Sequence, residues 1–136
     1  MEQSKLNIIL KEHARWLKDN SKGKRANLSD ANLTDANLKG ANLRNALGNS
    51  KEIKTLQTEF YTVVYTSTQM AIGCEQHAIT DWFKFDDKRI KAMDKRATNF
   101  WTIYKPILIT LTNINKSKRT NWRIKLYIRY LHGFNF

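Results

Sequence analysis

The stretch that decides the fold runs from residue 26 to residue 47 and reads ANLSD-ANLTD-ANLKG-ANLRN-AL. Four consecutive units repeat Ala-Asn-Leu with a period of five. This period matches neither an α-helix, whose apolar positions recur every 3.6 residues, nor a strand, whose period is two. A chain that turns a corner every five residues would point Ala and Leu inward, while Asn, Asp, Ser and Gly supply turn chemistry. We therefore predict a core made of the apolar positions of these units: Ala26, Leu28, Ala31, Leu33, Ala36, Leu38, Ala41 and Leu43.

These units resemble the pentapeptide repeat family, in which four units make one square coil of a right-handed β-helix. The resemblance implies a short right-handed quadrilateral β-helix of about one coil, within residues 22–50. Repeat folds bury their core by stacking neighbours, so a single coil has to be covered by other parts of the chain or by a second copy. We exclude the role of the family's long rods that mimic DNA, because residues 22–45 hold five basic and only two acidic residues.

The repeat is preceded by a predicted amphipathic helix within residues 1–21. Its apolar stripe follows the i, i+3, i+4, i+7 spacing of a helix face and comprises Leu6, Ile9, Leu10, His13, Trp16 and Leu17. We expect the helix to cap the coil by laying Leu6, Leu10 and Leu17 over one open end. A membrane-surface helix is the alternative, but Glu12 and Asp19 suit it poorly.

Residues 51–112 predict a small α+β segment, so the fold class is mixed α/β. The aromatic and β-branched run 60–66 indicates a strand. Pro106 removes a backbone donor and predicts a helix break; a break at Met93-Asp94, with Asp94 capping a new helix, is a second alternative. The expected elements are strands 52–58, 60–66 and 70–73 and helices at about 78–84, 87–105 and 106–112.

This second part is similar to the C-terminal half of small pentapeptide-repeat proteins carried by bacteriophages and prophages. The resemblance spans residues 5–112, and the later part of it is carried by Val64-Tyr65-Thr66, Ile72-Gly73-Cys74, His77, Trp82, Phe85-Asp86-Asp87, Met93-Asp94 and residues 101–107. It implies a genomic setting more than a function.

The sharpest local constellation for chemistry is Cys74-Glu75-Gln76-His77. A Cys-x2-His pair could supply two zinc ligands, but a structural zinc site needs four. We therefore favour a small buried Cys74 and a hydrogen-bonded His77 at a helix start, and predict neither metal nor cofactor. Asp86-Asp87 is more typical of helix capping than of catalysis. No phosphate loop or catalytic motif is present, so we predict no enzyme.

Composition bounds the class of protein. The chain has 136 residues, 41% of them hydrophobic, and a net charge of +12 from 24 basic and 12 acidic residues. One cysteine excludes an internal disulfide, and no apolar run is long enough for a membrane span. We expect a cytoplasmic protein, in the host cytoplasm if it is phage-encoded, without integral membrane contact.

Residues 113–136 form a basic, aromatic tail. Six cations and no carboxylate fall in this stretch, interleaved with aromatic and aliphatic residues that suit nucleic acid or an anionic membrane surface. A strand, a dimer contact or a recent extension without function are the alternatives. The candidate nucleic-acid-binding residues are Lys116, Lys118, Arg119, Trp122, Arg123, Lys125 and Arg129.

These observations favour a non-catalytic protein that binds a host macromolecule, with inhibition of a host defence system as one form. Direct nucleic-acid binding through the tail is the alternative function. A homodimer through the coil ends or the tail is compatible with both.

Overall fold

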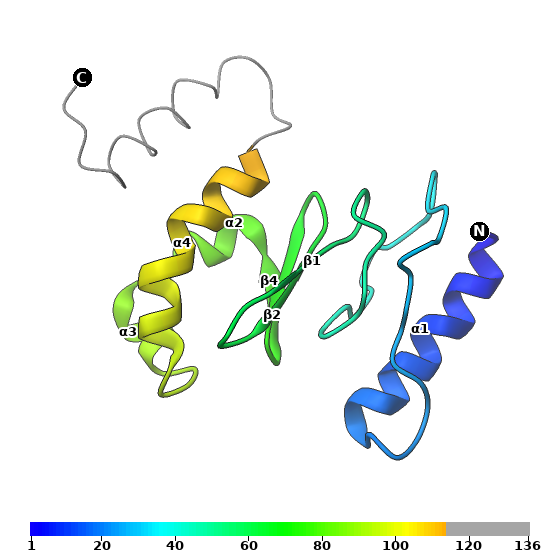
Figure 1. Cartoon of the computed structure of the whole chain (residues 1–136), viewed down its shortest axis with the longest axis horizontal. Helices are drawn as coiled ribbons and strands as arrows, with labels where there is room; N and C mark the ends of the chain where they lie inside the picture. The colour runs from blue at the N-terminus through cyan, green and yellow to red at the C-terminus, as the bar shows by residue number, and fades with distance from the viewer. Residues whose placement is uncertain (114–136) are drawn as a thin grey trace. The chain divides into compact units, whose positions relative to one another are not determined.

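The computed structural model describes residues 1–113 and divides the chain into two compact units, Met1–Trp82 and a second that begins at Phe83. The architecture is a mixed one, with helices and an open four-stranded antiparallel sheet (Figure 1). The first unit contains helix α1 (Gln3–Lys18), the repeat, and the sheet with helix α2 (Ile79–Trp82). Helices α3 (Asp87–Lys91) and α4 (Ala97–Asn113) belong to the second.

The predicted corner every five residues is present in residues 26–47, here called the repeat segment. The backbone N–H of each following Ala donates to the Leu carbonyl three residues earlier, at 3.0 Å in all four units. Each repeat Asn accepts, through its side chain, the N–H two residues later. Asp35, Gly40 and Asn45 have φ of 62°, 71° and 60°, the left-handed values that a type II turn requires at its third position.

The repeat segment returns to its own beginning after twenty residues. Asn27 and Leu47 form a parallel bridge. Leu28 N–H donates to Leu47 O at 2.8 Å, and Leu47 N–H donates to Ala26 O at 3.0 Å. Four units therefore bring the chain once around to lie beside itself.

The inside of the repeat segment is apolar. Ala26, Leu28, Leu33 and Leu43 are buried, and the other four predicted core residues are partly buried against the same cluster. Ala46 and Ile53, which our prediction of the core omitted, are fully buried in this cluster. The core therefore extends past the last full unit to the residues that lead into the sheet.

Helix α1 covers one side of the repeat segment (Figure 1). Leu6 is buried in the shared cluster, and Ile9 and Leu10 pack against it. Leu17 is half-buried and is not part of this cluster, so the first half of the helix makes the apolar contact.

The sheet covers the other side. Strands β1 (Lys54–Gln57), β2 (Thr62–Tyr65), β3 (Gln69–Ile72) and β4 (Glu75–Ala78) pair in that order, each antiparallel to the next. Their register aligns one cross-strand row, which is Thr55, Val64, Ala71 and Gln76. Val64 and Ala71, in the middle of this row, belong to the same cluster as the repeat leucines.

The sheet differs from the sequence prediction in one strand. The three predicted strands are present: β1 and β2 are shorter than predicted, and β3 is shifted by one residue. Strand β4 was not predicted. Its sequence, Glu-Gln-His-Ala, lacks the β-branched and aromatic residues that mark strands; tertiary pairing with β3 across the tight Gly73-Cys74 turn holds it. The predicted helix at about 78–84 is accordingly limited to α2, and His77 lies in a strand and not at a helix start.

In the second unit, the helix break lies at a different place from the one predicted at Pro106. The predicted helices 87–105 and 106–112 are wrong, because α4 continues through Pro106. The break falls at 92–96 and so includes Met93-Asp94, where the sequence offered a further break. Asp94 accepts a hydrogen bond from Arg96 N–H at 2.8 Å at this break, just before α4. Phe100, Trp101 and Leu108 are buried on both sides of the proline, and their packing outweighs the one backbone hydrogen bond that proline removes.

No helix within residues 1–113 is both long and apolar enough to cross a membrane.

Candidate functional site

The sheet closes one side of the repeat segment by binding its backbone through side chains. Gln76 donates from Nε2 to Ala41 O at 2.9 Å, and its Oε1 accepts from Leu43 N–H at 3.0 Å. Thr55 Oγ1 accepts from Gly48 N–H at 2.9 Å and donates to Ala46 O at 3.1 Å. The amide of Gln76 thus gives two backbone groups of the repeat segment their hydrogen-bond partners.

Helix α1 closes the opposite side in the same way. Gln3 donates from Nε2 to Asn37 O at 3.0 Å and accepts from Asn37 N–H at 2.9 Å. His13 is fully buried: its Nδ1 accepts from Ala26 N–H at 3.0 Å, and its Nε2 lies 2.8 Å from Arg44 O. Because Nδ1 is an acceptor, the proton belongs on Nε2, which makes His13 the neutral tautomer.

The surroundings of His13 favour this neutral form. Burial lowers the pKa of His13 below its ordinary value, and the nearby positive charges of Arg25 and Arg44 lower it further. The hydrogen bond to the Arg44 carbonyl acts in the opposite direction. The apolar stripe that predicted helix α1 included His13, but its spacing carried no sign of these two backbone contacts.

With both sides covered, the repeat segment offers a partner only its outward positions. We call the exposed side chains between the repeat leucines and the next alanines the outer belt: Ser29, Asp30, Thr34, Asp35 and Lys39. These groups are polar or charged and stand on a backbone fixed by repeated turn hydrogen bonds. The belt suits polar recognition of a partner surface.

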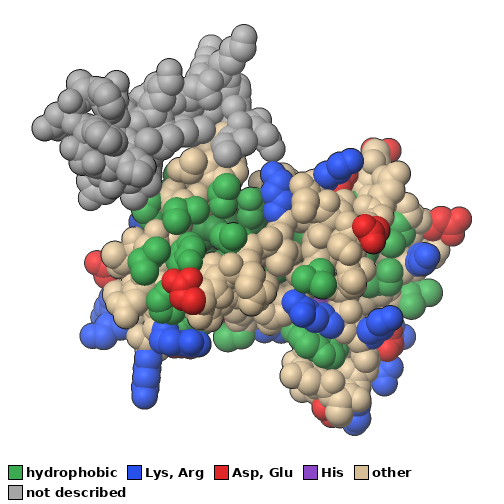
Figure 2. All heavy atoms as spheres, viewed as in Figure 1, with side chains coloured by type: hydrophobic (Ala, Val, Ile, Leu, Met, Phe, Trp, Pro, Cys, Tyr) green, Lys and Arg blue, Asp and Glu red, His purple; other side chains and the backbone are tan. Residues whose placement is uncertain are grey.

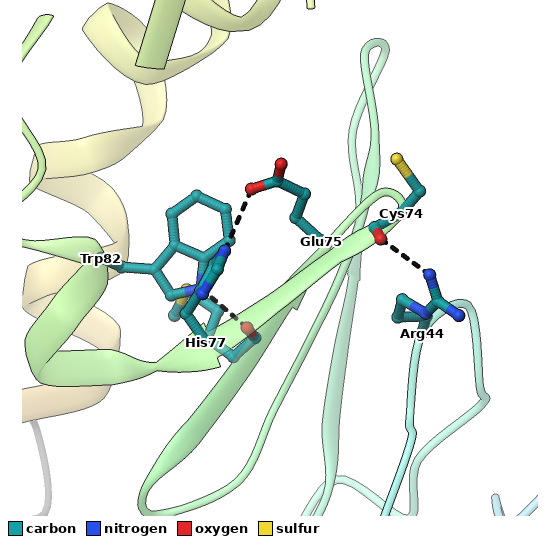
Figure 3. Close-up of polar contacts among 6 residues, drawn as sticks. Arg44, Cys74, Glu75, His77 and Trp82 are labelled. Carbon is teal, nitrogen blue, oxygen red and sulfur yellow. Dashed lines mark hydrogen bonds and ion pairs between the residues drawn. The ribbon is translucent and has the colours of Figure 1, made fainter. Parts of the chain in front are cut away.

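The structure does not bring Cys74 and His77 together as a pair of ligands. In Figure 3 the Cys74 thiol stands at one end of the strand, whereas the His77 ring lies apart from it, beside Trp82. His77 Nε2 lies 3.0 Å from Glu75 Oε2, and its ring meets the Trp82 ring edge-on at 5.0 Å. Trp82 in turn donates from Nε1 to Met70 O at 2.7 Å. His77 is therefore held by side-chain contacts on β4 and α2.

Cys74 is exposed, which corrects the expectation of a buried thiol. It lies in the β3–β4 turn, a position that leaves its side chain outside the core. Arg44 donates from Nη1 to the Cys74 carbonyl at 2.8 Å, which ties the repeat segment to this turn (Figure 3).

The Asp86-Asp87 pair provides a helix cap. Asp86 accepts from Arg89 N–H at 2.8 Å and is the N-cap of α3, which confirms the capping prediction. Within residues 1–113, no group of three or more His, Cys, Asp or Glu side chains could hold a metal ion.

Charge is distributed unevenly along the chain. Residues 1–82 contain eleven basic and nine acidic residues, whereas residues 83–113 contain seven basic and three acidic residues. Residues 114–136 contain six basic residues and no acidic one. The candidate nucleic-acid-binding residues of the tail, from Lys116 to Arg129, lie outside the described residues.

Comparison with known proteins identifies one part of the chain. Residues 24–48 match the family model described as pentapeptide repeats (8 copies). The match confirms the assignment of this segment and covers less than a fifth of the chain. No curated protein and no solved structure matches the sequence.

Sequence reasoning missed the residues that close the repeat segment. Gln3, Thr55 and Gln76 are ordinary polar residues of a helix or strand in the sequence. Only the pairing of β4 with β3 places Gln76 in one row with Thr55, and that strand had no sequence signal.

Proposed function

We propose that the protein is a non-catalytic binding protein whose repeat segment forms one coil of a right-handed quadrilateral β-helix. The five-residue turns, the parallel bridge after twenty residues and the match to the family model support this geometry. The coil acts as a rigid mount for the outer belt.

The observation that carries the proposal is that the chain itself closes both sides of the repeat segment, with Gln3 and His13 on one side and Thr55 and Gln76 on the other. A second copy that stacked on either side would have to displace α1 or the sheet. The outward face is therefore the part of the segment that is left for a partner.

A host macromolecule is the partner that the sequence resemblance to phage and prophage proteins supports. In this proposal the protein acts in the host cytoplasm, and inhibition of a host defence system is one form of its activity. This step rests on resemblance alone, because fold does not determine function.

An affinity experiment tests the proposal. Full-length protein is immobilised and exposed to bacterial lysate beside a belt variant, Thr34→Arg/Lys39→Glu, and a control variant on the outer face of α1, Ala14→Arg/Lys11→Glu. All substituted residues are exposed, so folding should be retained. We expect a stoichiometric partner that the wild type and the control retain and the belt variant loses. A partner that all three retain, or no partner above background, would contradict the role of the belt.

Nucleic-acid binding through the tail is the second candidate, and the uneven charge favours it. The first unit is nearly neutral, while the tail has six cations without an anion. Neutralising the tail, with Gln at the six positions Lys116, Lys118, Arg119, Arg123, Lys125 and Arg129, should weaken binding to DNA and flatten its dependence on salt. If the wild type does not bind at about 50 mM salt, where nonspecific contacts are favoured, this function fails.

A further inference from the structure

A group of exposed lysines lies on α3 and on the link to α4. Lys88 and Lys91 are three residues apart in α3, a spacing that puts them on the same side of a helix. Lys91 and Lys95 line one open hollow of about 610 Å³, together with Met93, Asp94 and Thr98. We call Lys88, Lys91 and Lys95 the α3 lysines; all three are exposed. Figure 2 shows Lys and Arg side chains gathered at the lower left of the view, where Figure 1 places α3.

The carboxylates of this stretch lower the net charge around the α3 lysines, but within residues 1–113 none of them forms an ion pair with these lysines. Asp86 and Asp94 each accept a backbone hydrogen bond at 2.8 Å, from Arg89 N–H and Arg96 N–H. Asp87 lies in the first turn of α3 and lines a different hollow, beside Trp101.

Two other cations of the unit are engaged with aromatic rings. The Arg89 guanidinium lies 4.9 Å from the centre of the Phe85 ring, and Lys105 Nζ lies 5.8 Å from the centre of the Trp101 ring. These contacts hold Arg89 and Lys105 against their own unit. The α3 lysines, like Lys84, are exposed to solvent, where a partner can reach them.

We propose that the α3 lysines bind the phosphate backbone of a nucleic acid without reading its sequence. Closely spaced cations gain affinity for a polyphosphate when they release the ions condensed on it. Helix α3 has only five residues, too few to fill a major groove and read base edges. The proposal rests on the nucleic-acid candidate above and extends it from the tail to a surface of the folded unit.

The test compares full-length variants with equal changes in net charge. The patch variant is Lys88→Gln/Lys91→Gln/Lys95→Gln. The matched control is Lys5→Gln/Lys11→Gln/Lys18→Gln, which removes three exposed lysines from α1. A rescue variant replaces the α3 lysines with Arg, and the third arm is the tail variant described above. Binding to two short duplexes of unrelated sequence is measured by fluorescence anisotropy between about 50 and 200 mM salt, with circular dichroism to check folding.

We expect the patch variant to bind both duplexes at least about tenfold more weakly than the wild type. The slope of log K against log salt should fall by about 2 to 3, because each phosphate contact contributes about 0.9. The α1 control should keep the slope of the wild type, and the Arg variant should restore binding.

Four outcomes would overturn the proposal. Equal losses of DNA affinity in the patch variant and the α1 control would mean that affinity depends on the net charge of the protein and not on the position of the lysines. A loss of DNA affinity in the tail variant alone would refute a role for the α3 lysines, while nucleic-acid binding through the tail would still be supported. Failure of the wild type to bind would end both the patch proposal and the nucleic-acid function. Binding of the wild type to vesicles of phosphatidylserine and phosphatidylcholine, but not to duplexes, would assign the lysines to a membrane surface.

Discussion

At the scale of single residues, the closure of the repeat segment depends on a few polar side chains that each bind two backbone groups. Gln76 and His13 are the clearest cases. A buried backbone donor or acceptor without a partner costs about 1–3 kcal/mol. These positions should therefore be sensitive to substitution, although nothing in the sequence marked their contacts with the backbone.

His13 should make the stability of the protein depend on pH. Its pKa is lowered in the fold, chiefly by burial, so the unfolded chain takes up a proton at a higher pH than the native chain does. The contribution of His13 to the free energy of unfolding should be at its maximum above about pH 6.5, the ordinary pKa of histidine. It should decrease as the pH drops from there toward the lowered pKa of the native state. Urea midpoints between pH 7.5 and 5 measure this.

The matched variants for this prediction are His13→Gln and His77→Gln. The His13 variant should be less stable at neutral pH, and its stability should no longer decrease between about pH 6.5 and 5. The His77 variant should show the same decrease as the wild type. Asp19 and Glu52 also have lowered pKa values, but they titrate below this pH range. An unchanged decline in the His13 variant would show that another group is responsible.

Gln76→Ala should lower the free energy of unfolding by about 1–3 kcal/mol, because Ala41 O and Leu43 N–H lose their partner. Gln57→Ala is the control: Gln57 is exposed at the end of β1, and a change of less than about 0.5 kcal/mol is expected there. Chemical denaturation of both variants measures these changes. Equal decreases in the free energy of unfolding would refute the special role of Gln76.

At the scale of elements, α1 is a cover fixed mainly by its first half. Leu6 is 1% exposed within the shared cluster, whereas Ile8, two residues later, is 64% exposed. The same helix thus presents one buried and one exposed aliphatic side chain of nearly equal size.

Leu6→Ala should cost about 2–5 kcal/mol, the usual range for a buried leucine. Ile8→Ala should cost little because its side chain is already in contact with water. Thermal melts followed by circular dichroism would report both changes. Comparable shifts in the melting temperature would mean that α1 is not seated by Leu6.

The sequence predicted elements where local pattern and packing agree. The apolar stripe located α1, the period of five located the turns, and β-branched residues located β2. It failed where tertiary contacts decide: β4 is held by β3, and the packing on both sides of Pro106 carries α4 through the proline. The candidate site was predicted as a set of core positions, while its closing residues required the register of the sheet.

At the scale of the whole molecule, two units of different character share one chain. The first is nearly neutral and contains the entire cluster that surrounds the repeat, while the basic excess lies from residue 83 onward. In the proposals above, the outer belt that binds a host macromolecule and the lysines that bind phosphate therefore lie in different parts of the protein.

A fragment of residues 1–82 should fold alone, because every member of that cluster comes from it. Circular dichroism should show a cooperative melt, and Leu6→Ala should lower the melting temperature of the fragment as it does in the full chain. A fragment that lacks a cooperative transition would show that the first unit depends on the second.

The bridge between Asn27 and Leu47 also restricts how such a protein can change in length. The groups that meet Gln3 and His13, and those that meet Thr55 and Gln76, occur at fixed corners of one circuit. An insertion of five, ten or fifteen residues would add only part of a circuit. It would shift α1 or the sheet away from the backbone groups that it binds. In the coil proposed above, only an insertion of about twenty residues would restore the alignment, so we expect the fold to tolerate added repeats in sets of four.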